Sequence, residues 1–249
     1  MTARTTLVLL PGLDGTEIFF GPLLVHLPAW IDPVVVAYPS SGPNAYDDLL
    51  AIANRELSSR RDFVVLGWSF GGPLALMVAE RMRSQVSGVI LCNSFVSSPR
   101  PRLALFRFAA MTPVIATVRA LRRARFLVPG YADGALRKAK AKTWKRVNAR
   151  ALAARSRAAL GVDVRSLLAR SGVPVMYLAS TQDEVISRRS LDEVLALAPQ
   201  TEVTEVDGPH MALFSNPAQS AARIVDFLQR IGEKRRLKSG AGLRRSVSG

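Results

Sequence analysis

Short runs of apolar residues alternate along the chain with longer stretches in which apolar residues recur every three or four positions. The short runs are rich in Val, Leu and Ile and are bounded by Gly, Pro or charged residues. Most of them lack strict polar–apolar alternation, which is typical of parallel strands buried on both faces. The pattern predicts strands at residues 6–10, 34–38, 63–67, 86–92, 173–179 and 202–206.

The longer stretches predict helices between these strands, at residues 19–27, 45–58, 71–83, 188–198 and 218–229. A regular alternation of strand and helix requires crossover connections, which are right-handed in almost all proteins. The fold class is therefore α/β: a mostly parallel sheet of about six strands with helices on both faces.

One long segment interrupts this alternation between the fourth and fifth predicted strands. It contains no convincing strand and is rich in Ala, Arg and Leu, which predicts an insertion of several short helices. We expect a core formed by residues 1–97 and 161–232, a basic helical insertion at 98–160, and a disordered basic tail at 233–249, which is rich in Gly, Ser, Lys and Arg.

The composition limits the possible classes of protein. The chain has 249 residues, of which 49% are hydrophobic, and a mean hydropathy of +0.16, so it is not a disordered chain. A single cysteine, Cys92, excludes an intrachain disulfide framework, and no cluster of His, Cys and carboxylates predicts a metal site. No apolar run reaches the length of a secretory signal or a membrane span, which favours a cytoplasmic location.

The net charge of +15 is unevenly distributed. Residues 98–160 hold 16 Lys and Arg against one acid, and residues 233–249 hold six against one, whereas the rest of the chain has 12 basic and 17 acidic residues. Such asymmetry indicates an anionic partner, which would be nucleic acid, a membrane surface or an acidic protein. The alternative is a solvated basic face with no partner.

The sequence Gly67-Trp68-Ser69-Phe70-Gly71-Gly72 follows a predicted strand and opens a predicted helix. This is the Gly-x-Ser-x-Gly pattern, in which a serine on a tight turn needs neighbours without side chains. Ser69 is therefore the candidate nucleophile.

A serine nucleophile requires a base, and the chain has two histidines. His26 lies within a predicted helix among aliphatic residues and is expected to be structural or at the surface. His210 lies in a loop after the last strand, at the same end of the parallel sheet as Ser69, and is the candidate base. Asp183 follows the preceding strand and would orient the imidazole, with Glu184 as its competitor, and the order Ser, Asp, His fits this pattern.

Two backbone N–H groups are expected to stabilise an oxyanion. One belongs to Phe70, at the start of the helix after Ser69. The other belongs to Leu13, in the glycine-containing loop Pro11-Gly12-Leu13-Asp14-Gly15 that follows the first strand.

These motifs together resemble the α/β-hydrolase superfamily, over residues 5–97 and 170–231. The chain departs from many relatives in having Pro11 where they have histidine before the glycine. The resemblance implies that the insertion is a cap domain that shapes the acyl pocket. The body of the chain is also similar to the pimeloyl-[acyl-carrier protein] methyl ester esterases, which are capped enzymes of similar size.

The resemblance implies a serine esterase that acts through an acyl-enzyme without metal or organic cofactor. The basic cap would then dock an acidic carrier protein or an anionic membrane, with Arg122, Arg123 and Arg125 as docking residues. A thioesterase or lysophospholipase at an anionic surface would use the same three residues. A third interpretation is a non-catalytic nucleic-acid-binding protein on a hydrolase scaffold, against which the complete set of three residues argues.

Overall fold

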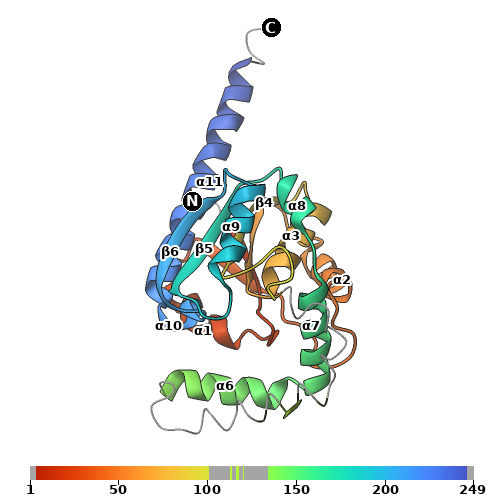
Figure 1. Cartoon of the computed structure of the whole chain (residues 1–249). Helices are drawn as coiled ribbons and strands as arrows, with labels where there is room; N and C mark the ends of the chain where they lie inside the picture. Colours follow the sequence, from red (N-terminus) through yellow and green to blue (C-terminus); the bar gives the residue numbers. More distant parts are fainter. Residues whose placement is uncertain (1–3, 101–112, 114–115, 118–119, 121–133, 246–249) are drawn as a thin grey trace.

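A computed structural model describes residues 4–100, 113, 116, 117, 120 and 134–245 of the chain (Figure 1). Its six strands form one sheet in the order β2-β1-β3-β4-β5-β6, and every neighbouring pair is parallel, as the sequence predicts. The strands are β1 (Thr5–Leu10), β2 (Ile31–Val35), β3 (Phe63–Trp68), β4 (Val86–Cys92), β5 (Val175–Gln182) and β6 (Glu202–Pro209).

Helices cover both faces of this sheet, and each face has its own apolar core. One core packs the sheet against α2 (Tyr46–Leu57), α3 (Gly71–Arg81), α8 (Arg165–Ala169) and α9 (Arg188–Leu197). The other packs it against η1 (Ile18–Phe20), α1 (Gly21–His26), α10 (Ala212–Ser215) and α11 (Pro217–Arg245). All six residues of β3 are buried, which explains its unbroken apolar sequence.

The second strand differs from its predicted position. The apolar run suggested residues 34–38, but β2 spans Ile31–Val35 and includes Pro33. Because β2 is an edge strand that pairs only with β1, the missing N–H of Pro33 costs no ladder hydrogen bond on its open side. Proline usually indicates that a segment is not a strand, but this edge position of the sheet tolerates Pro33.

The inserted segment contributes two described helices, α6 (Gly134–Arg146) and α7 (Ala149–Gly161). In Figure 1, α6 crosses below the carboxyl ends of the strands and α7 leads from it back toward the core. An isolated antiparallel bridge joins Ser97 to Asp163, where the chain leaves the core and where it returns. Arg122, Arg123 and Arg125 lie outside the described residues.

The expectation of a disordered tail is wrong for residues 233–245. Helix α11 continues through Arg245 and projects beyond the core (Figure 1). Its buried residues up to Ile231 anchor the helix, and the sequence beyond has no proline and several strong helix formers. An ion pair between Arg235 and Asp62 links this extension to the core. Within the described residues, none of the helices combines the length and the apolarity that a bilayer span requires.

Candidate active site

Ser69 lies at the turn between β3 and α3, at the carboxyl end of the sheet. Its φ of 53° is in the left-handed region, where a residue with a side chain is strained. Two hydrogen bonds hold this conformation: Ser69 N–H donates to the Cys92 carbonyl at 2.8 Å, and the Ser94 hydroxyl donates to the Ser69 carbonyl at 2.6 Å. The turn therefore presents the Ser69 side chain in a fixed orientation.

The glycines around Ser69 are required by close backbone approaches. A Cβ at position 67 would lie 2.3 Å from the Gly71 carbonyl oxygen, and one at position 71 would lie 2.4 Å from the Leu10 carbonyl oxygen. A Cβ at position 72 would lie 1.8 Å from the Ser94 hydroxyl that holds Ser69. The helix can thus begin directly against β1 and β3 only because these positions carry no side chain.

The structure brings Ser69, His210 and Asp183 into one hydrogen-bonded chain. His210 Nε2 lies 3.0 Å from Ser69 Oγ, and His210 Nδ1 lies 2.8 Å from Asp183 Oδ2. The other carboxylate oxygen, Asp183 Oδ1, accepts hydrogen bonds from the backbone N–H groups of Val185 and Ile186 at 2.8 and 2.9 Å. The His210 and Asp183 side chains are only 13% and 9% exposed, so little water competes for these bonds.

His210 is also held through its own carbonyl group. That oxygen accepts hydrogen bonds from Trp68 Nε1 at 3.2 Å and from Asn93 Nδ2 at 3.0 Å, and the Trp68 ring lies 5.7 Å from the imidazole. Asn93 also bonds the hydroxyl and N–H of Ser180. No motif in the sequence pointed to a role for Asn93 or Trp68, although Trp68 ends β3 and Asn93 directly follows β4.

The competing residues lie outside this chain of bonds. Glu184 is exposed, and Asp207 is exposed near the end of β6. His26 is exposed at the end of α1. Cys92 is buried, and burial raises the pKa of its thiol well above the ordinary value, so the sulfur stays protonated. No group of three or more His, Cys, Asp or Glu suited to a metal ion occurs among the described residues.

The loop after β1 forms a tight turn in which the Gly15 N–H donates to the Gly12 carbonyl at 3.0 Å. In a trans peptide the C=O and N–H groups point in opposite directions, so the Leu13 N–H points out of the turn. Within the described part of the chain this N–H donates no hydrogen bond. The Leu13 amide is thus available to a ligand.

Phe70 immediately precedes α3, so its N–H belongs to a helix end whose donors have no acceptor within the helix. The Tyr46 hydroxyl donates to the Phe70 carbonyl at 3.0 Å, and the two rings stack with centroids 4.6 Å apart. Tyr38 packs edge-on against the same ring. These aromatic contacts hold Phe70 at the start of the helix.

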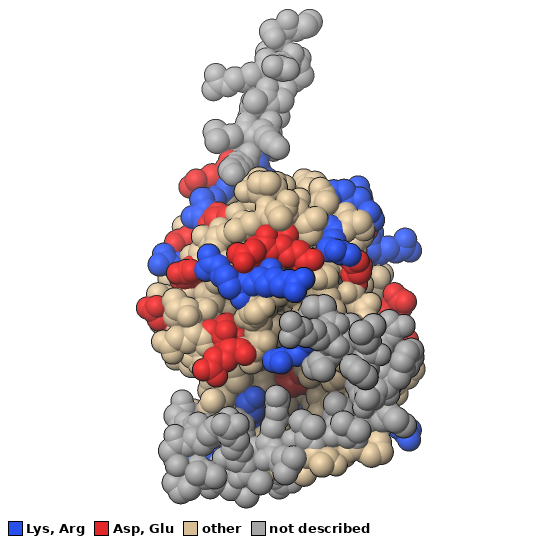
Figure 2. Space-filling model, in the orientation of Figure 1, with Lys and Arg blue, Asp and Glu red and all other residues tan. Residues whose placement is uncertain are grey.

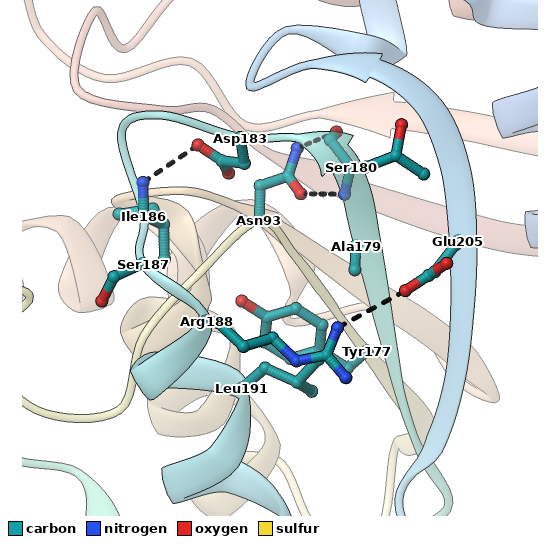
Figure 3. Close-up of a pocket in the computed structure, with 11 residues that line it drawn as sticks. Asn93, Tyr177, Ala179, Ser180, Asp183, Ile186, Ser187, Arg188, Leu191 and Glu205 are labelled. Carbon is teal, nitrogen blue, oxygen red and sulfur yellow. Dashed lines mark hydrogen bonds and ion pairs between the residues drawn. The ribbon is translucent and has the colours of Figure 1, made fainter.

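A cavity of about 230 Å³ lies beside Asp183 (Figure 3). Asp183, Asn93 and Ser180 line one end of it, and Arg188, which pairs with Glu205 at 3.5 Å, lies at the other. Neither Ser69 nor His210 lines this cavity. It therefore adjoins the carboxylate end of the hydrogen-bonded chain and does not contain the serine end.

Charge is distributed differently on the core and on the insertion. On the face shown in Figure 2, acidic and basic side chains are interleaved across the described core. Residues 134–161 in contrast contain nine Lys and Arg and no acid. On α6, the exposed side chains include Lys138, Lys142 and Lys145, and Arg146 pairs with Glu17 on the core.

Comparison with known protein families gives one match over most of the chain. The family model described as "Alpha/beta hydrolase family" matches residues 7–223. A search of curated protein sequences gave no match.

Several solved structures are similar in fold at low sequence identity. A carboxylesterase from Nitrososphaera gargenis is 17% identical, with a TM-score of 0.77 and coverage of 94% of this chain and 93% of its own. The enol-lactonase from Burkholderia xenovorans LB400 is 18% identical, with a TM-score of 0.76 and coverage of 91% and 92%. A thermophilic esterase from Thermogutta terrifontis is 14% identical, with a TM-score of 0.77 and coverage of 93% and 92%.

Proposed function

The chain belongs to the alpha/beta hydrolase family, and from that premise we propose that it is a serine hydrolase that cleaves carboxylic esters. The observation that carries the proposal is the continuous chain of hydrogen bonds from Ser69 through His210 to Asp183. A nucleophile, a base within 3.0 Å of it and a carboxylate that orients the base are the parts that acyl transfer needs.

In the first half of the proposed reaction, His210 Nε2 takes the proton of Ser69 as Oγ attacks the ester carbonyl carbon. The carbonyl oxygen becomes an oxyanion, to which the N–H groups of Leu13 and Phe70 donate hydrogen bonds. Asp183 stabilises the imidazolium through the 2.8 Å bond to Nδ1. The C–O bond to the alcohol then breaks, His210 gives its proton to the leaving oxygen, and an acyl-enzyme remains.

In the second half, water replaces the alcohol. His210 removes a proton from the water as it attacks the acyl carbon, and the same two N–H groups bind the second oxyanion. Collapse of this intermediate returns the proton to Ser69 Oγ and releases the carboxylic acid. The nucleophile, the base, the carboxylate and the two N–H donors all belong to the chain, so the proposed reaction uses neither a metal ion nor an organic cofactor. Thioesters and lysophospholipids contain an acyl carbonyl open to the same attack.

The test is turnover of p-nitrophenyl esters of graded acyl length by the purified protein. Ser69→Ala and His210→Ala should each lower kcat/KM by a factor of about 10³ or more without lowering the melting temperature appreciably. The length series also measures how far an acyl chain can extend. Wild-type-like turnover by either variant would contradict the assignment, and tight binding of labelled DNA without turnover would favour a non-catalytic scaffold.

We further propose that the basic insertion binds an acidic partner that carries the ester, an acyl-[acyl-carrier protein] methyl ester being one such substrate. The support is the absence of acids from residues 134–161 together with the exposed Lys138, Lys142 and Lys145 on α6. Exposed charges act mainly on the rate of association, and salt screens them over about 8 Å at physiological strength.

Charge reversal of these three lysines to Glu should therefore lower kcat/KM for a carrier-bound ester and leave kcat nearly unchanged. A neutral p-nitrophenyl ester has no charge for α6 to attract, so its turnover should stay the same. Added salt should have the same selective effect. The same reversal at Arg122, Arg123 and Arg125 tests the sequence-based docking residues. Charge reversal that changes the turnover of both substrates equally, or of neither, would contradict carrier docking. Charge reversal that weakens only the binding of the protein to anionic vesicles would favour a membrane surface.

A further inference from the structure

The largest fully buried side chain of the described residues is a charged one, Arg155 of α7. It is 0% exposed, although it lies in the basic insertion that the sequence suggested to be a solvated or docking surface. A guanidinium removed from water is costly unless its N–H groups are hydrogen-bonded. The contacts of Arg155 therefore indicate why this position is not apolar.

Arg155 donates four hydrogen bonds to neutral oxygen atoms of two separate loops, the one after β1 and the one between β2 and α2. Nη1 donates to the carbonyls of Leu13 at 3.0 Å and Asp14 at 2.8 Å. Nη2 donates to the carbonyl of Pro39 at 2.6 Å, and Nε donates to Asn44 Oδ1 at 2.8 Å. Within the described residues it forms no ion pair with a carboxylate. Its bonds thus fix loop backbone, and two of the four are to the loop that follows β1.

The bond to the Leu13 carbonyl completes the fixation of the two peptide groups that flank Leu13. The peptide before Leu13 is held by the bond between the Gly12 carbonyl and the Gly15 N–H. The peptide after it is held by Arg155 through the Leu13 carbonyl. With both peptide planes fixed, the direction of the Leu13 N–H is fixed as well.

The loop is also shaped to admit the guanidinium. Gly15 has a φ of +71°, and a Cβ there would lie 2.5 Å from Arg155 Nη1. The Tyr38 ring lies 5.3 Å from the guanidinium carbon, and its hydroxyl donates to the Pro11 carbonyl at 3.0 Å. Burial lowers the pKa of Arg155 to about 10, which still leaves the side chain cationic at neutral pH.

We propose that Arg155 is a positioning residue that orients the Leu13 N–H for oxyanion binding, so that the insertion completes the active site of the core. The inference rests on the proposed function. An N–H that is aimed at the oxyanion stabilises the transition state more than the bound ester, so its misalignment lowers kcat and changes KM little.

The first experiment compares Arg155→Met and Arg155→Lys with Arg150→Met, an exposed arginine of the same helix. Loss of one oxyanion donor typically costs a factor of about 10² to 10³ in kcat. We expect Arg155→Met to lose about 10²-fold in kcat. Arg155→Lys should lose at least about tenfold, because one ammonium group cannot replace the four hydrogen bonds by which the guanidinium joins two loops. KM should stay within about threefold, and Arg150→Met should match the wild type.

A second measurement distinguishes positioning from partial unfolding. A trifluoromethyl ketone that adds to Ser69 forms an oxyanion, so its affinity should fall by the same factor as kcat/KM in the Arg155 variants. Rates are divided by the active fraction found by titration with a fluorophosphonate. If Arg155→Met does not fold, Arg155→Lys carries the test. A kcat within about threefold of wild type in the folded variant overturns the proposal.

Hydrogen exchange makes the result independent of esterase activity. The N–H groups of Gly15 and Thr16 are hydrogen-bonded within the loop, so they should exchange faster in Arg155→Met than in Arg150→Met. If the wild type cleaves no ester, the proposed function fails while faster exchange still supports the holding of this loop. If the wild type is active and both exchange and kcat are unchanged in Arg155→Met, only the role of Arg155 is refuted.

Discussion

Replacement of Asp183 by Asn should inactivate the protein by a mechanism that the hydrogen bonds specify. Oδ1 accepts from the N–H groups of Val185 and Ile186, so an asparagine at 183 would keep its carbonyl oxygen there. The reverse orientation would place an NH₂ group against these two N–H donors and lose both hydrogen bonds, each worth about 0.5–1.5 kcal/mol. The amide NH₂ would therefore lie against His210 Nδ1, where Oδ2 now lies at 2.8 Å.

An NH₂ group at this position can only donate a hydrogen bond, so Nδ1 must accept it and the imidazole proton moves to Nε2. Nε2 then has no lone pair with which to take the proton of Ser69, although the distances hardly change. The same wrong tautomer in a serine protease costs about 10⁴-fold in kcat, which corresponds to about 5 kcal/mol of transition-state stabilisation. We expect a loss of similar size here.

The assay is kcat for the best p-nitrophenyl ester, measured for Asp183→Asn and for Glu184→Gln as the matched control. Glu184 is the adjacent acid and is exposed, so its variant should keep wild-type activity. Thermal unfolding should show both variants folded. An Asp183→Asn variant that retains more than about a tenth of wild-type kcat would refute the argument from tautomers, and inactivation by Glu184→Gln instead would reassign the acid.

Two further predictions concern the residues around Ser69. Gly67→Ala should lower the melting temperature by about 6–12 °C, because overpacking against the Gly71 carbonyl costs about 3 kcal/mol. Gly21→Ala, with nothing within 4 Å of the new Cβ, should change it little; equal melting temperatures would contradict the steric account. Cys92 should resist thiol reagents at pH 8 in the native protein and react fully in denaturant, because burial keeps the thiol protonated; rapid native labelling would contradict its burial.

Most of the sheet and the Ser69 chain could be predicted because their signals are local. Buried parallel strands such as β3 are continuous apolar runs, and parallel strands end on the same side, which places Asp183 and His210 near Ser69. Strand β2 was misplaced because the tolerance of Pro33 depends on the strand being at the edge of the sheet, which is a property of topology. The helical extension of α11 was missed because a basic composition resembles that of a linker.

Arg155 and Asn93 could not be assigned roles because their partners are distant in sequence. Arg155 bonds Leu13 from 142 positions away, and Asn93 bonds His210 from 117 positions away. One local signal was present: Arg155 follows Ala151 by four residues, so the two share a helix face, and both are fully buried. A charged residue on an otherwise small and apolar helix face indicates a buried hydrogen-bond donor, but the acceptors appear only in the folded chain.

The way the insertion joins the core has a consequence for how such a protein can diversify. Strands β4 and β5 are direct neighbours, and the Ser97–Asp163 bridge joins the two ends of the segment between them. Since a doubling of loop length costs only about 0.6 kcal/mol in closure entropy, the sheet should tolerate insertions of very different size at this point. A segment transplanted from another protein would nevertheless have to supply a guanidinium where Arg155 now lies. Without this guanidinium we expect a chimera that folds but has a low kcat. Recombination at this junction would therefore preserve folding stability more readily than the rate of catalysis.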